Sequence, residues 1–556
     1  MSNLAASMDP VPSAEVPEVL LGPVGRTSGV PEVLLQPRPD FEYLSHQETG
    51  VRWMMAREEP GAAVCRGGIL GDDMGLGKTG QAIGLLKNSP YKLRTLIICP
   101  PALMAGWTDE LQACGFAVST LLQSSVWSLP VGAGATSVWL TSYPKACLYK
   151  MALATAADPF ERIILDEGHV IRNGKQTSRW LSCMAIAKRA VCRWILSATP
   201  VQNGPNDWRN LCWWLRVRCA PADVPRLGPT LMLRRTMAEL RAVIASLPPL
   251  PRFVDHDLSI SAGTAEGKLF RVLCDQMENA LENKSVSALI KLELWMRIQQ
   301  FLVHPQIYVE AMRSKFGRGA YCRPDWVSGP DGTGGGGASK WTACVGELRR
   351  AIGEQIGTIV FCNFRSEMDK VAAVAEGLGA AVFAIRGGMD PDAVRLAVAD
   401  AKAACALGDS ERKGVVIIVQ IVSGGAGLNL QFCKRILFLS QHWNPAVVHQ
   451  AVGRAVRIGQ SVAVEVHFFR CVDDVLDNID RRMMDIHIAK IAGARAICET
   501  LYEGFAPVVI EGVEGLEAAK AAASAPALSE ADRTALVAAD AIVAASATEE
   551  VSEDPN

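Results

Sequence analysis

The chain has 556 residues, of which 49% are hydrophobic and 21% charged, and its formal net charge is −2. This length allows two to four domains with sizeable cores, and no apolar run approaches the ~20 residues that a membrane span requires. The N-terminus lacks the basic and hydrophobic regions of a secretory signal, so we expect an intracellular soluble protein whose 16 cysteines are reduced and mostly buried.

The two ends of the chain are acidic and the body is basic. Residues 1–40 carry −3 and residues 511–556 carry −8, which leaves +9 for the body. A basic body fits a groove that follows nucleic-acid phosphates, although ordinary scatter of charge over a large surface gives the same sum. Residues 1–40 are Pro-rich and contain Val-Pro-Glu-Val-Leu-Leu twice, at 16–21 and 30–35. We expect a disordered leader in which the repeat is accidental or, alternatively, a docking peptide.

A phosphate-binding loop is predicted between a strand at 68–70 and a helix that includes 81–86. Glycines let the backbone approach phosphates, and the helix N-terminus adds N–H groups and the positive end of its dipole. Lys78 would reach the β- and γ-phosphates, and the Thr79 hydroxyl would ligate Mg²⁺. The strict pattern has Gly where this chain has Asp72, so the loop alone could also be a turn that binds nothing. Its nucleotide-binding residues are Asp73, Met74, Gly75, Leu76, Gly77, Lys78 and Thr79.

Two later strands also end in polar residues. An apolar run at 162–165 is predicted to be a buried strand that ends in Asp166 and Glu167. In an ATPase, Asp166 would hold Mg²⁺ and Glu167 would orient and deprotonate the attacking water. Such a strand end is commonplace by itself, but here it follows the phosphate loop in the order that an ATPase requires. Another predicted strand, at 194–196, runs into the small residues Ser197 and Thr199.

The second half contains helices and then a further set of strands. Residues from about 250 to 325 look helical, and residues 329–337 form a Gly-rich connector. Three buried strands are predicted beyond the connector, at 358–362, 414–419 and 435–439.

Two arginines near the end of this part are candidate catalytic cations. Arg454 and Arg457 are three residues apart, which predicts that they share one face of a helix. Two cations aimed at a triphosphate would stabilise the charge of the transition state. Isolated surface arginines usually form salt bridges instead, but the flanking Gln and Gly residues favour the catalytic interpretation.

Together these stretches resemble the superfamily 2 helicase-type motors of the Swi/Snf group of DNA translocases. The motif wording is most similar to the branch that holds the helicase-like transcription factor and a transcription termination factor. Val456 and Gly168 depart from the usual His and Ala, and neither change removes a charge needed for hydrolysis. The resembling stretches span about residues 41–500 and are 44–53, 67–79, 96–107, 163–173, 196–203, 423–430 and 442–460.

The resemblance implies an α/β fold with two RecA-like parallel-sheet lobes that bind ATP and Mg²⁺ between them. Repair members of the branch often carry a RING zinc domain, but no Cys-x-x-Cys pair occurs in this chain. We therefore predict no RING domain and no structural zinc. The predicted domains are a disordered leader at 1–40, lobe 1 at 41–250, a helical insertion and Gly-rich linker at 251–338, lobe 2 at 339–505, and a disordered Ala-rich acidic tail at 506–556.

The resemblance also implies residue roles. Gln47 would contact adenine, and Arg454 and Arg457 would reach the γ-phosphate when the cleft closes. Residues that would relay the nucleotide state to the nucleic-acid side are Ser197, Thr199 and Gln450. Candidate DNA contacts are Thr141, Ser142, Arg365, Ser423 and Gly425.

The implied activity is ATP-driven translocation along duplex DNA without sequence preference. The implied targets are DNA-bound proteins such as nucleosomes or a polymerase, displaced by a monomeric motor in the nucleus or another DNA-containing compartment. Two alternatives remain open: a strand-separating DNA or RNA helicase, and an ATP-regulated DNA clamp that does not translocate. The sequence does not distinguish transcription, repair and remodelling.

Overall fold

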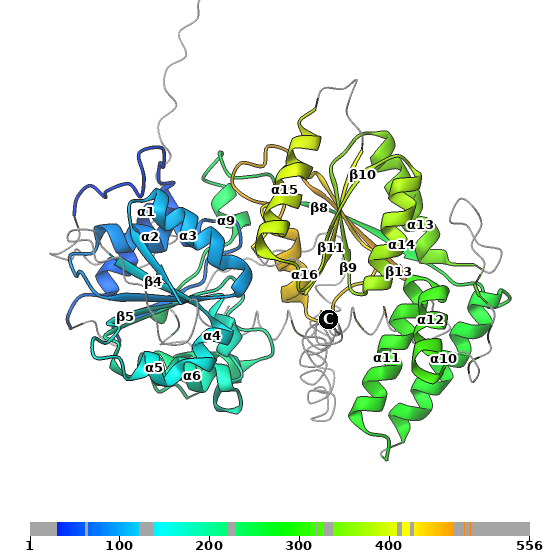
Figure 1. The fold of residues 1–556 in the computed structure, drawn as a ribbon, viewed down its shortest axis with the longest axis horizontal. Helices are drawn as coiled ribbons and strands as arrows, with labels where there is room; N and C mark the ends of the chain where they lie inside the picture. Colours follow the sequence, from blue (N-terminus) through cyan, green and yellow to red (C-terminus); the bar gives the residue numbers. More distant parts are fainter. Residues whose placement is uncertain are drawn as a thin grey trace, which may run out of the picture.

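The computed structural model shows two lobes, each built on a parallel β-sheet with helices on both faces (Figure 1). The predicted α/β fold with two parallel-sheet lobes is confirmed. No helix in the described part of the chain is long and apolar enough to cross a membrane. The structure describes residues 31–61, 65–121, 137–220, 228, 230–283, 285–317, 321, 323, 325–326, 337–407, 414–422, 427–471, 480, 483, 487 and 490.

Lobe 1 contains a seven-stranded sheet in the order β3-β4-β2-β5-β6-β1-β7, and all neighbouring strands are parallel. Its central strands are apolar and buried because helices cover both faces. The carboxyl ends of β5, β6 and β1 lie side by side, which brings their loops together. The strands are β1 (Gly67–Leu70), β2 (Thr95–Cys99), β3 (Ala117–Thr120), β4 (Ser137–Ser142), β5 (Arg162–Asp166), β6 (Cys192–Leu196) and β7 (Met232–Leu233).

Two groups of helices cover this sheet (Figure 1). One group contributes Val51, Leu85 and Leu111 to an apolar cluster on one face, and the other contributes Trp180 and Trp208 to a cluster on the opposite face. The first group is α1 (Ser45–Arg57), α2 (Lys78–Asn88) and α3 (Met104–Ala113). The second is α4 (Tyr143–Leu148), α5 (Lys150–Ala154), α6 (Ser178–Ile186) and α7 (Pro205–Trp214), and α9 (Met237–Arg241) follows β7.

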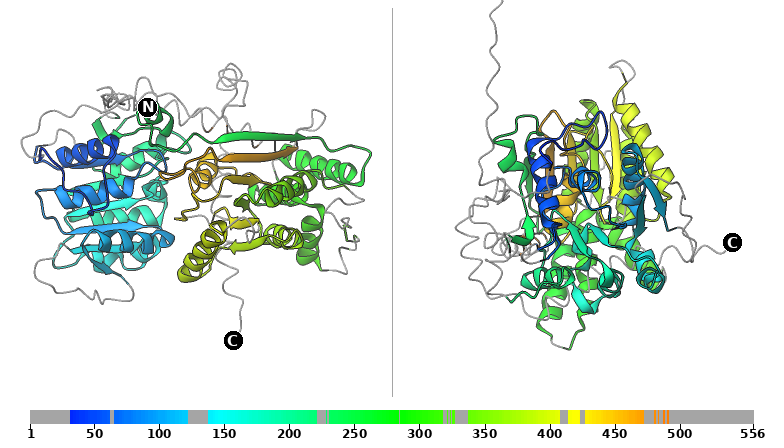
Figure 2. Two further views of the ribbon diagram at one scale, coloured as in Figure 1. Left: turned by 90° about the horizontal axis from the view of Figure 1, so that it is seen from above. Right: turned by 90° about the vertical axis from the view of Figure 1, so that its left-hand side faces the viewer.

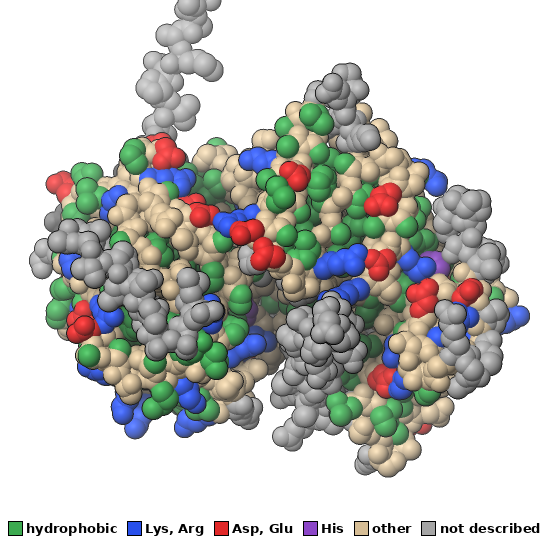
Figure 3. Space-filling view, viewed as in Figure 1, with side chains coloured by type: hydrophobic (Ala, Val, Ile, Leu, Met, Phe, Trp, Pro, Cys, Tyr) green, Lys and Arg blue, Asp and Glu red, His purple; other side chains and the backbone are tan. Residues whose placement is uncertain are grey.

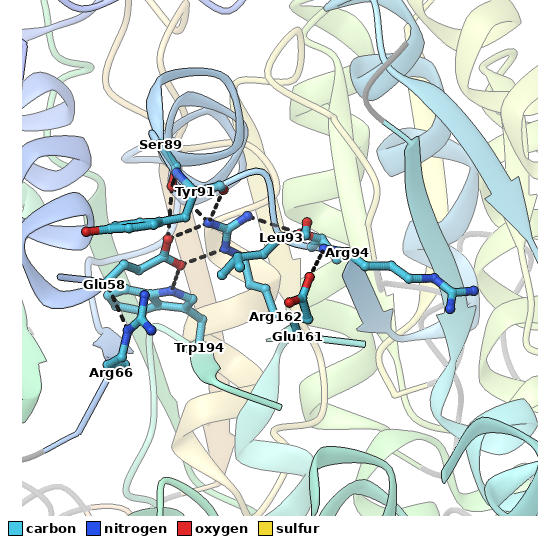
Figure 4. Close-up of polar contacts among 10 residues, drawn as sticks. Glu58, Arg66, Ser89, Tyr91, Leu93, Arg94, Glu161, Arg162 and Trp194 are labelled. Atoms are coloured by element: carbon cyan, nitrogen blue, oxygen red, sulfur yellow. Dashed lines mark hydrogen bonds and ion pairs between the residues drawn. The ribbon is translucent and has the colours of Figure 1, made fainter. Parts of the chain in front are cut away.

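A buried ion pair joins four elements at the amino end of this sheet (Figure 4). Glu58, which ends α1, is fully buried and forms a bidentate pair with Arg162, the first residue of β5. The same carboxylate accepts hydrogen bonds from Trp194 Nε1 at 2.9 Å and from Ser89 Oγ at 3.2 Å. All of the donors are needed, because a buried charge left without a partner is strongly destabilising. The pair thus fixes the ends of α1 and α2 against β5 and β6.

Lobe 2 contains a six-stranded sheet in the order β10-β11-β9-β12-β13-β8, again entirely parallel. The strands predicted around 358–362, 414–419 and 435–439 form its centre as β9, β11 and β12. The strands are β8 (Arg252–Leu258), β9 (Thr358–Cys362), β10 (Ala381–Ile385), β11 (Val415–Gln420), β12 (Arg435–Phe438) and β13 (Glu465–Cys471).

The edge strand β8 corrects the prediction that the chain is helical from about residue 250. It pairs with β13 along its whole length, from Arg252 opposite Glu465 to Leu258 opposite Cys471. Figure 2 (left) shows the two strands side by side, β8 in green and β13 in orange. Its sequence, Arg-Phe-Val-Asp-His-Asp-Leu, is more charged than a central parallel strand tolerates, and the edge position accommodates it. The chain therefore enters the second sheet before the helical insertion.

The helical insertion is the predicted one, and it lies beside lobe 2 as three helices (Figure 1). They share an apolar cluster that includes Phe270, Phe301 and Trp443. Of the remaining helices, two cover one face of the second sheet and two the other. The bounds are α10 (Ala265–Glu282), α11 (Ala288–Val303), α12 (Pro305–Phe316), α13 (Ser339–Gly353), α14 (Arg365–Gly377), α15 (Pro391–Cys405) and α16 (Pro445–Val452).

Residues 31–40 lie against lobe 1, so the predicted disorder of the leader does not extend to them. Leu34 is 7% exposed, and Leu35 exchanges two backbone hydrogen bonds with the Asn88 side chain, at 2.6 and 2.9 Å. The Arg52 guanidinium donates to the carbonyls of Pro31 and Glu32. Residues 31–35, the described part of the second copy of the hexapeptide, thus dock on α1 and α2. The first copy, most of the Gly-rich connector and the predicted tail lie outside the described residues.

Candidate active site

The predicted phosphate loop joins β1 to α2 at the carboxyl edge of the first sheet. Gly75 and Gly77 have φ values of 82° and 79°, in the left-handed region that favours glycine. A Cβ on Gly77 would lie 2.3 Å from the Gln47 amide nitrogen, so a larger residue would collide there. The loop and the N-terminus of α2 therefore present backbone N–H groups in the arrangement that binds phosphate.

Asp72, the departure from the strict loop pattern, has a structural role. Its carboxylate is fully buried and forms a bidentate pair with Arg235, and Gln81 Nε2 donates to it at 3.0 Å. Burial alone would raise the pKa of Asp72, but Arg235 holds it below its usual value. Arg235 also donates to the carbonyl of His46. The pair therefore connects the phosphate loop to α1 and to the segment after β7.

Lys78 lies between the loop and the carboxylates that follow β5. Its Nζ donates to the carbonyl oxygens of Asp72 and Asp73, at 2.7 and 3.1 Å. Burial lowers the pKa of Lys78, and the negative charge of Glu167 is the strongest influence in the opposite direction. A half-buried ammonium among carbonyl and carboxylate oxygens is suited to holding the negative oxygens of a phosphate.

Asp166 and Glu167 end β5 beside the phosphate loop. Asp166 accepts hydrogen bonds from Trp107 Nε1 at 2.7 Å and from the Glu167 backbone N–H at 3.0 Å. Burial raises the pKa of Asp166. Burial acts in the same direction on Glu167, but His169 and the nearby cations outweigh it and lower the pKa of Glu167. Glu167 has φ of 48°, a left-handed conformation that is uncommon for this residue type. Backbone strain of this kind is concentrated at functional sites.

Arg454 and Arg457 come from lobe 2 and lie against this site. Arg454 is 6% exposed, and although burial lowers its pKa, the charges of Glu167 and Asp166 act in the opposite direction. The lobes approach so closely that a Cβ on Gly75 would be 2.9 Å from the carbonyl oxygen of Val456. The closed cleft therefore contains both carboxylates, the lysine and the two cations.

The prediction that the two arginines share a helical face is wrong. Helix α16 ends at Val452, and the arginines lie in the turns that follow it. Backbone hydrogen bonds run from Arg454 to Ala451 and from Ala455 to Val452, the spacing of a 3-10 turn, and one bond with α-helical spacing runs from Val456 to Val452. A Cβ on Gly453 would be 2.9 Å from Met74 Cβ. The chain must therefore pass close to the phosphate loop here, and a tight turn permits this.

A chain of polar contacts connects Glu167 to lobe 2. His169 Nδ1 lies 3.3 Å from Glu167 Oε2 and 3.1 Å from Ser197 Oγ. Ser197 Oγ accepts from the Thr199 backbone N–H, and Thr199 Oγ1 accepts from Gln202 Nε2 at 3.1 Å. Across the cleft, Asn444 Nδ2 donates to Gln202 Oε1 at 2.9 Å. Since Asn444 caps α16, this path joins the catalytic carboxylate to the helix that precedes the arginines.

The other predicted residues have different environments. Gln47 Nε2 donates to the Leu76 carbonyl at 3.2 Å, which places it on the phosphate loop. Gln450 lies on α16, and Arg365 is half-buried at the start of α14. Thr141 and Ser142 are 0% and 5% exposed, so neither presents surface to a polynucleotide in this conformation. Ser423 and Gly425 lie outside the described residues.

The site fits a nucleoside triphosphate with a divalent cation. Glu167 Oε2 is buried and has no hydrogen-bond partner in the described part of the chain. Thr79, in the first turn of α2, supplies a hydroxyl, and Asp166 supplies a carboxylate, the oxygen ligands that Mg²⁺ prefers. The lysine and arginines balance the charge of phosphate oxygens. The fold and the site together define a two-lobed ATPase whose active site is completed by both lobes.

Comparison with protein families agrees with this class. A model described as the SNF2-related domain matches residues 46–221, and one described as the helicase conserved C-terminal domain matches residues 339–459. Together they match more than half of the chain, and the chain belongs to the SNF2-related helicase-like ATPases. It is therefore a nucleic-acid-dependent ATPase.

Individual relatives are distant. A protein of Orgyia pseudotsugata multicapsid polyhedrosis virus named "Probable global transactivator" is 26% identical over 79% of this chain and 88% of its own length. Transcription termination factor 2 of Drosophila melanogaster is 22% identical over 84% of this chain, which spans 58% of that relative. The chain spans about half the length of several other relatives. Among solved structures, the Sulfolobus solfataricus SWI2/SNF2 ATPase core in complex with dsDNA is 19% identical in sequence to this chain. The match covers 85% of this chain and 99% of the solved chain, with a TM-score of 0.36.

Several residues of the site were not predicted from the sequence. Trp107, Gln202 and Asn444 lie within the stretches that carry the family resemblance, and Arg235 lies outside them, but local spacing gives no sign of their partners. Their partners are 59, 163 and 242 residues away in the sequence. Only the strand order brings them together.

Proposed function

We propose that this protein hydrolyses Mg²⁺-bound ATP to move along duplex DNA and to remodel or displace proteins bound to it. The observation that supports this most strongly is the shared site, in which Arg454 of lobe 2 lies beside Glu167 and Asp166 of lobe 1. Hydrolysis that requires residues of both lobes must be coupled to the opening and closing of the cleft between them. Such a cycle can be coupled to stepwise movement of one lobe relative to the other along a polymer.

Each side chain has a definite part in the proposed reaction. Lys78 and the loop N–H groups hold the β- and γ-phosphates, and Thr79 and Asp166 would hold a magnesium ion, which would neutralise part of the phosphate charge. Glu167 orients the attacking water and accepts its proton. Arg454 and Arg457 stabilise the negative charge that develops on the transferred phosphoryl group. The hydrogen-bonded path through Ser197 and Thr199 then reports the state of the site across the cleft.

The polynucleotide would be held by its phosphates across both lobes, and so without sequence preference. On the face shown in Figure 3, basic side chains occur on both lobes and are interspersed with acidic ones. Arg365 at the start of α14 is a candidate contact on lobe 2. Duplex DNA is proposed as the substrate because the chain belongs to the SNF2-related family, and a monomer in a DNA-containing compartment is the simplest form of such a motor.

The proposal is tested by steady-state ATP hydrolysis with no nucleic acid, with single-stranded DNA, with duplex DNA and with RNA. Glu167→Gln is measured in parallel, because it removes the base but preserves the shape of the side chain. We expect strong stimulation by duplex DNA and at least about a 100-fold loss of turnover in the variant, with ADP affinity unchanged.

The other outcomes favour the two alternatives. Greater stimulation by single strands or RNA would indicate a strand-separating helicase. ATP binding without stimulation by any polynucleotide would indicate a clamp. If duplex DNA stimulates hydrolysis, displacement of a streptavidin block from biotinylated duplex DNA then tests translocation directly.

A further inference from the structure

Two histidines and a glutamate meet at the edge of lobe 2, far from the nucleotide cleft. In the pairing of β8 with β13, His467 lies opposite Val254 and His256 lies opposite Phe469. Side chains of paired residues share a face, so both imidazoles project to the same side of the sheet. Helix α13 packs against both strands and carries Glu347.

The distances within this cluster are those of a ligand set. His256 Nε2 lies 2.9 Å from His467 Nδ1, and Glu347 Oε2 lies 3.9 Å from the same nitrogen. One ligand atom from each of the three residues lies within 4.8 Å of the others. Ligand atoms of a tetrahedral zinc site are about 3.4 Å apart, given zinc–ligand bonds of about 2.0–2.1 Å. Small side-chain movements would therefore bring all three atoms to bonding distance of one ion.

A metal can take the place of the hydrogen bond between the two imidazoles. In the metal-free pair, one proton lies between His256 Nε2 and His467 Nδ1, and His467 Nε2 carries a proton in one tautomer and a lone pair in the other. That Nε2 atom is buried and has no hydrogen-bond partner among the described residues. A metal would replace the shared proton and use both lone pairs.

The outer nitrogen of His467 lies near a carboxylate, but beyond hydrogen-bond distance of it. His467 Nε2 lies 3.7 Å from Glu465 Oε2, on the side opposite the candidate ion. Metal-ligating histidines commonly donate their other N–H to a carboxylate, which fixes the ring and increases the basicity of the ligand. The ring of His256 is held in turn by stacking on Phe469, with centroids 4.5 Å apart.

We propose that His256, His467 and Glu347 bind a divalent transition-metal ion, with Zn²⁺ as the expected metal. Two imidazoles and a carboxylate form one of the ligand sets that zinc uses, with water as the fourth ligand. Glu347 would exchange its ion pair with the half-exposed Arg350 for the metal. This proposal departs from the prediction of no structural zinc, which was based on sequence spacing and stays a prediction until zinc binding is measured.

The ion would have a structural consequence for lobe 2. It would join the edge strand β8 to β13 and to α13, which otherwise meet through hydrogen bonds and apolar contacts. Because β8 is the first element of the second sheet after lobe 1, the ion would fix the point at which the chain enters lobe 2.

The test measures zinc binding by the full chain, independently of ATP hydrolysis. Protein stripped with a chelator is saturated with Mg²⁺ and ADP, so that the active-site carboxylates are occupied, and Zn²⁺ is titrated against a chromophoric chelator. The variants are His256→Phe, which keeps the stacking on Phe469, and Glu347→Gln, which keeps the shape of the side chain. The matched control is Asp257→Asn, an exposed position on the same strand.

We expect wild type and Asp257→Asn each to bind one equivalent of zinc. His256→Phe and Glu347→Gln should bind this equivalent more than about 100-fold more weakly. Loss of outer-shell partners alone costs roughly 10- to 100-fold, so loss of a ligand should cost more. Zinc should also raise the unfolding temperature of wild type and the control only. Equal zinc binding by all four proteins, or no bound equivalent in wild type, would overturn the proposal. Circular dichroism and ADP affinity establish that each variant is folded, and if His256→Phe does not fold, Glu347→Gln decides.

Discussion

The two lobes contribute to the active site in different ways. In lobe 1, the phosphate loop and the carboxylates are held by buried contacts within the lobe, among them the bidentate Asp72–Arg235 pair. In lobe 2, the arginines lie in turns after a short helix, and their position depends on contacts with the other lobe. The difference supports our proposal that the nucleotide site is preformed in lobe 1, whereas lobe 2 supplies the cations when the cleft closes.

The largest effect should come from removing a cation of lobe 2. Arg454→Ala should lower kcat by about 10³-fold or more, the range found for arginines that stabilise phosphoryl transfer. ADP affinity should change by less than about threefold, because lobe 1 holds the phosphates. Stopped-flow nucleotide binding and steady-state hydrolysis measure the two quantities. The control is Arg395→Ala, which removes an exposed ion pair with Asp109 of lobe 1. If ADP affinity falls as much as kcat, the division between the lobes is wrong.

A second substitution tests how firmly lobe 1 is preformed. Asp72→Ala should lower the free energy of unfolding by about 3–5 kcal/mol, because it leaves the buried Arg235 without a counter-charge. Urea denaturation measures this value. Asp392→Ala removes an exposed pair with Arg395 and should cost less than about 1 kcal/mol. The double variant Asp72→Leu/Arg235→Met should recover most of the loss. Similar free energies of unfolding for Asp72→Ala and Asp392→Ala would show that the phosphate loop does not depend on the Asp72–Arg235 pair.

The smallest effect should come from the bond between the lobes. Gln202→Leu should reduce DNA-stimulated kcat by roughly tenfold, since one hydrogen bond contributes about 1 kcal/mol and the Asn444 amide is left buried without its partner. ADP affinity should not change. A double-mutant cycle with Asn444→Ala should give a coupling of at least about 0.5 kcal/mol. Strictly additive effects would mean that this bond plays no part in closure.

The sequence predicts those parts of the structure that are encoded within short windows. The phosphate loop, the carboxylates after β5 and the central strands of both sheets follow from local patterns of apolar, glycine and charged residues. The site roles of these residues are still predictions to be tested by the variants above. The boundaries of the five predicted domains also stay predictions.

The remaining features depend on contacts between distant segments. Strand β8 is charged and becomes a strand only because β13 pairs with it. The turn that carries Arg454 is set by the close approach of Gly453 to Met74 in the other lobe. The cluster of His256, Glu347 and His467 spans 211 residues of sequence and exists only in the folded sheet. A spacing rule applied to a single window cannot detect any of these.

The buried pair of Glu58 and Arg162 has a consequence for synthesis of the chain. The two residues are 104 positions apart, and Trp194 follows Glu58 by 136 positions. At about 5–20 residues per second, a ribosome makes Arg162 roughly 5–20 s after Glu58. During that interval α1 has no counter-charge to dock against, and it stays exposed to solvent and to chaperones. Lobe 1 can therefore complete its folding only after β6 has been synthesised. A pause in translation between Glu58 and Trp194 would prolong the period in which the nascent chain is open to aggregation and proteolysis.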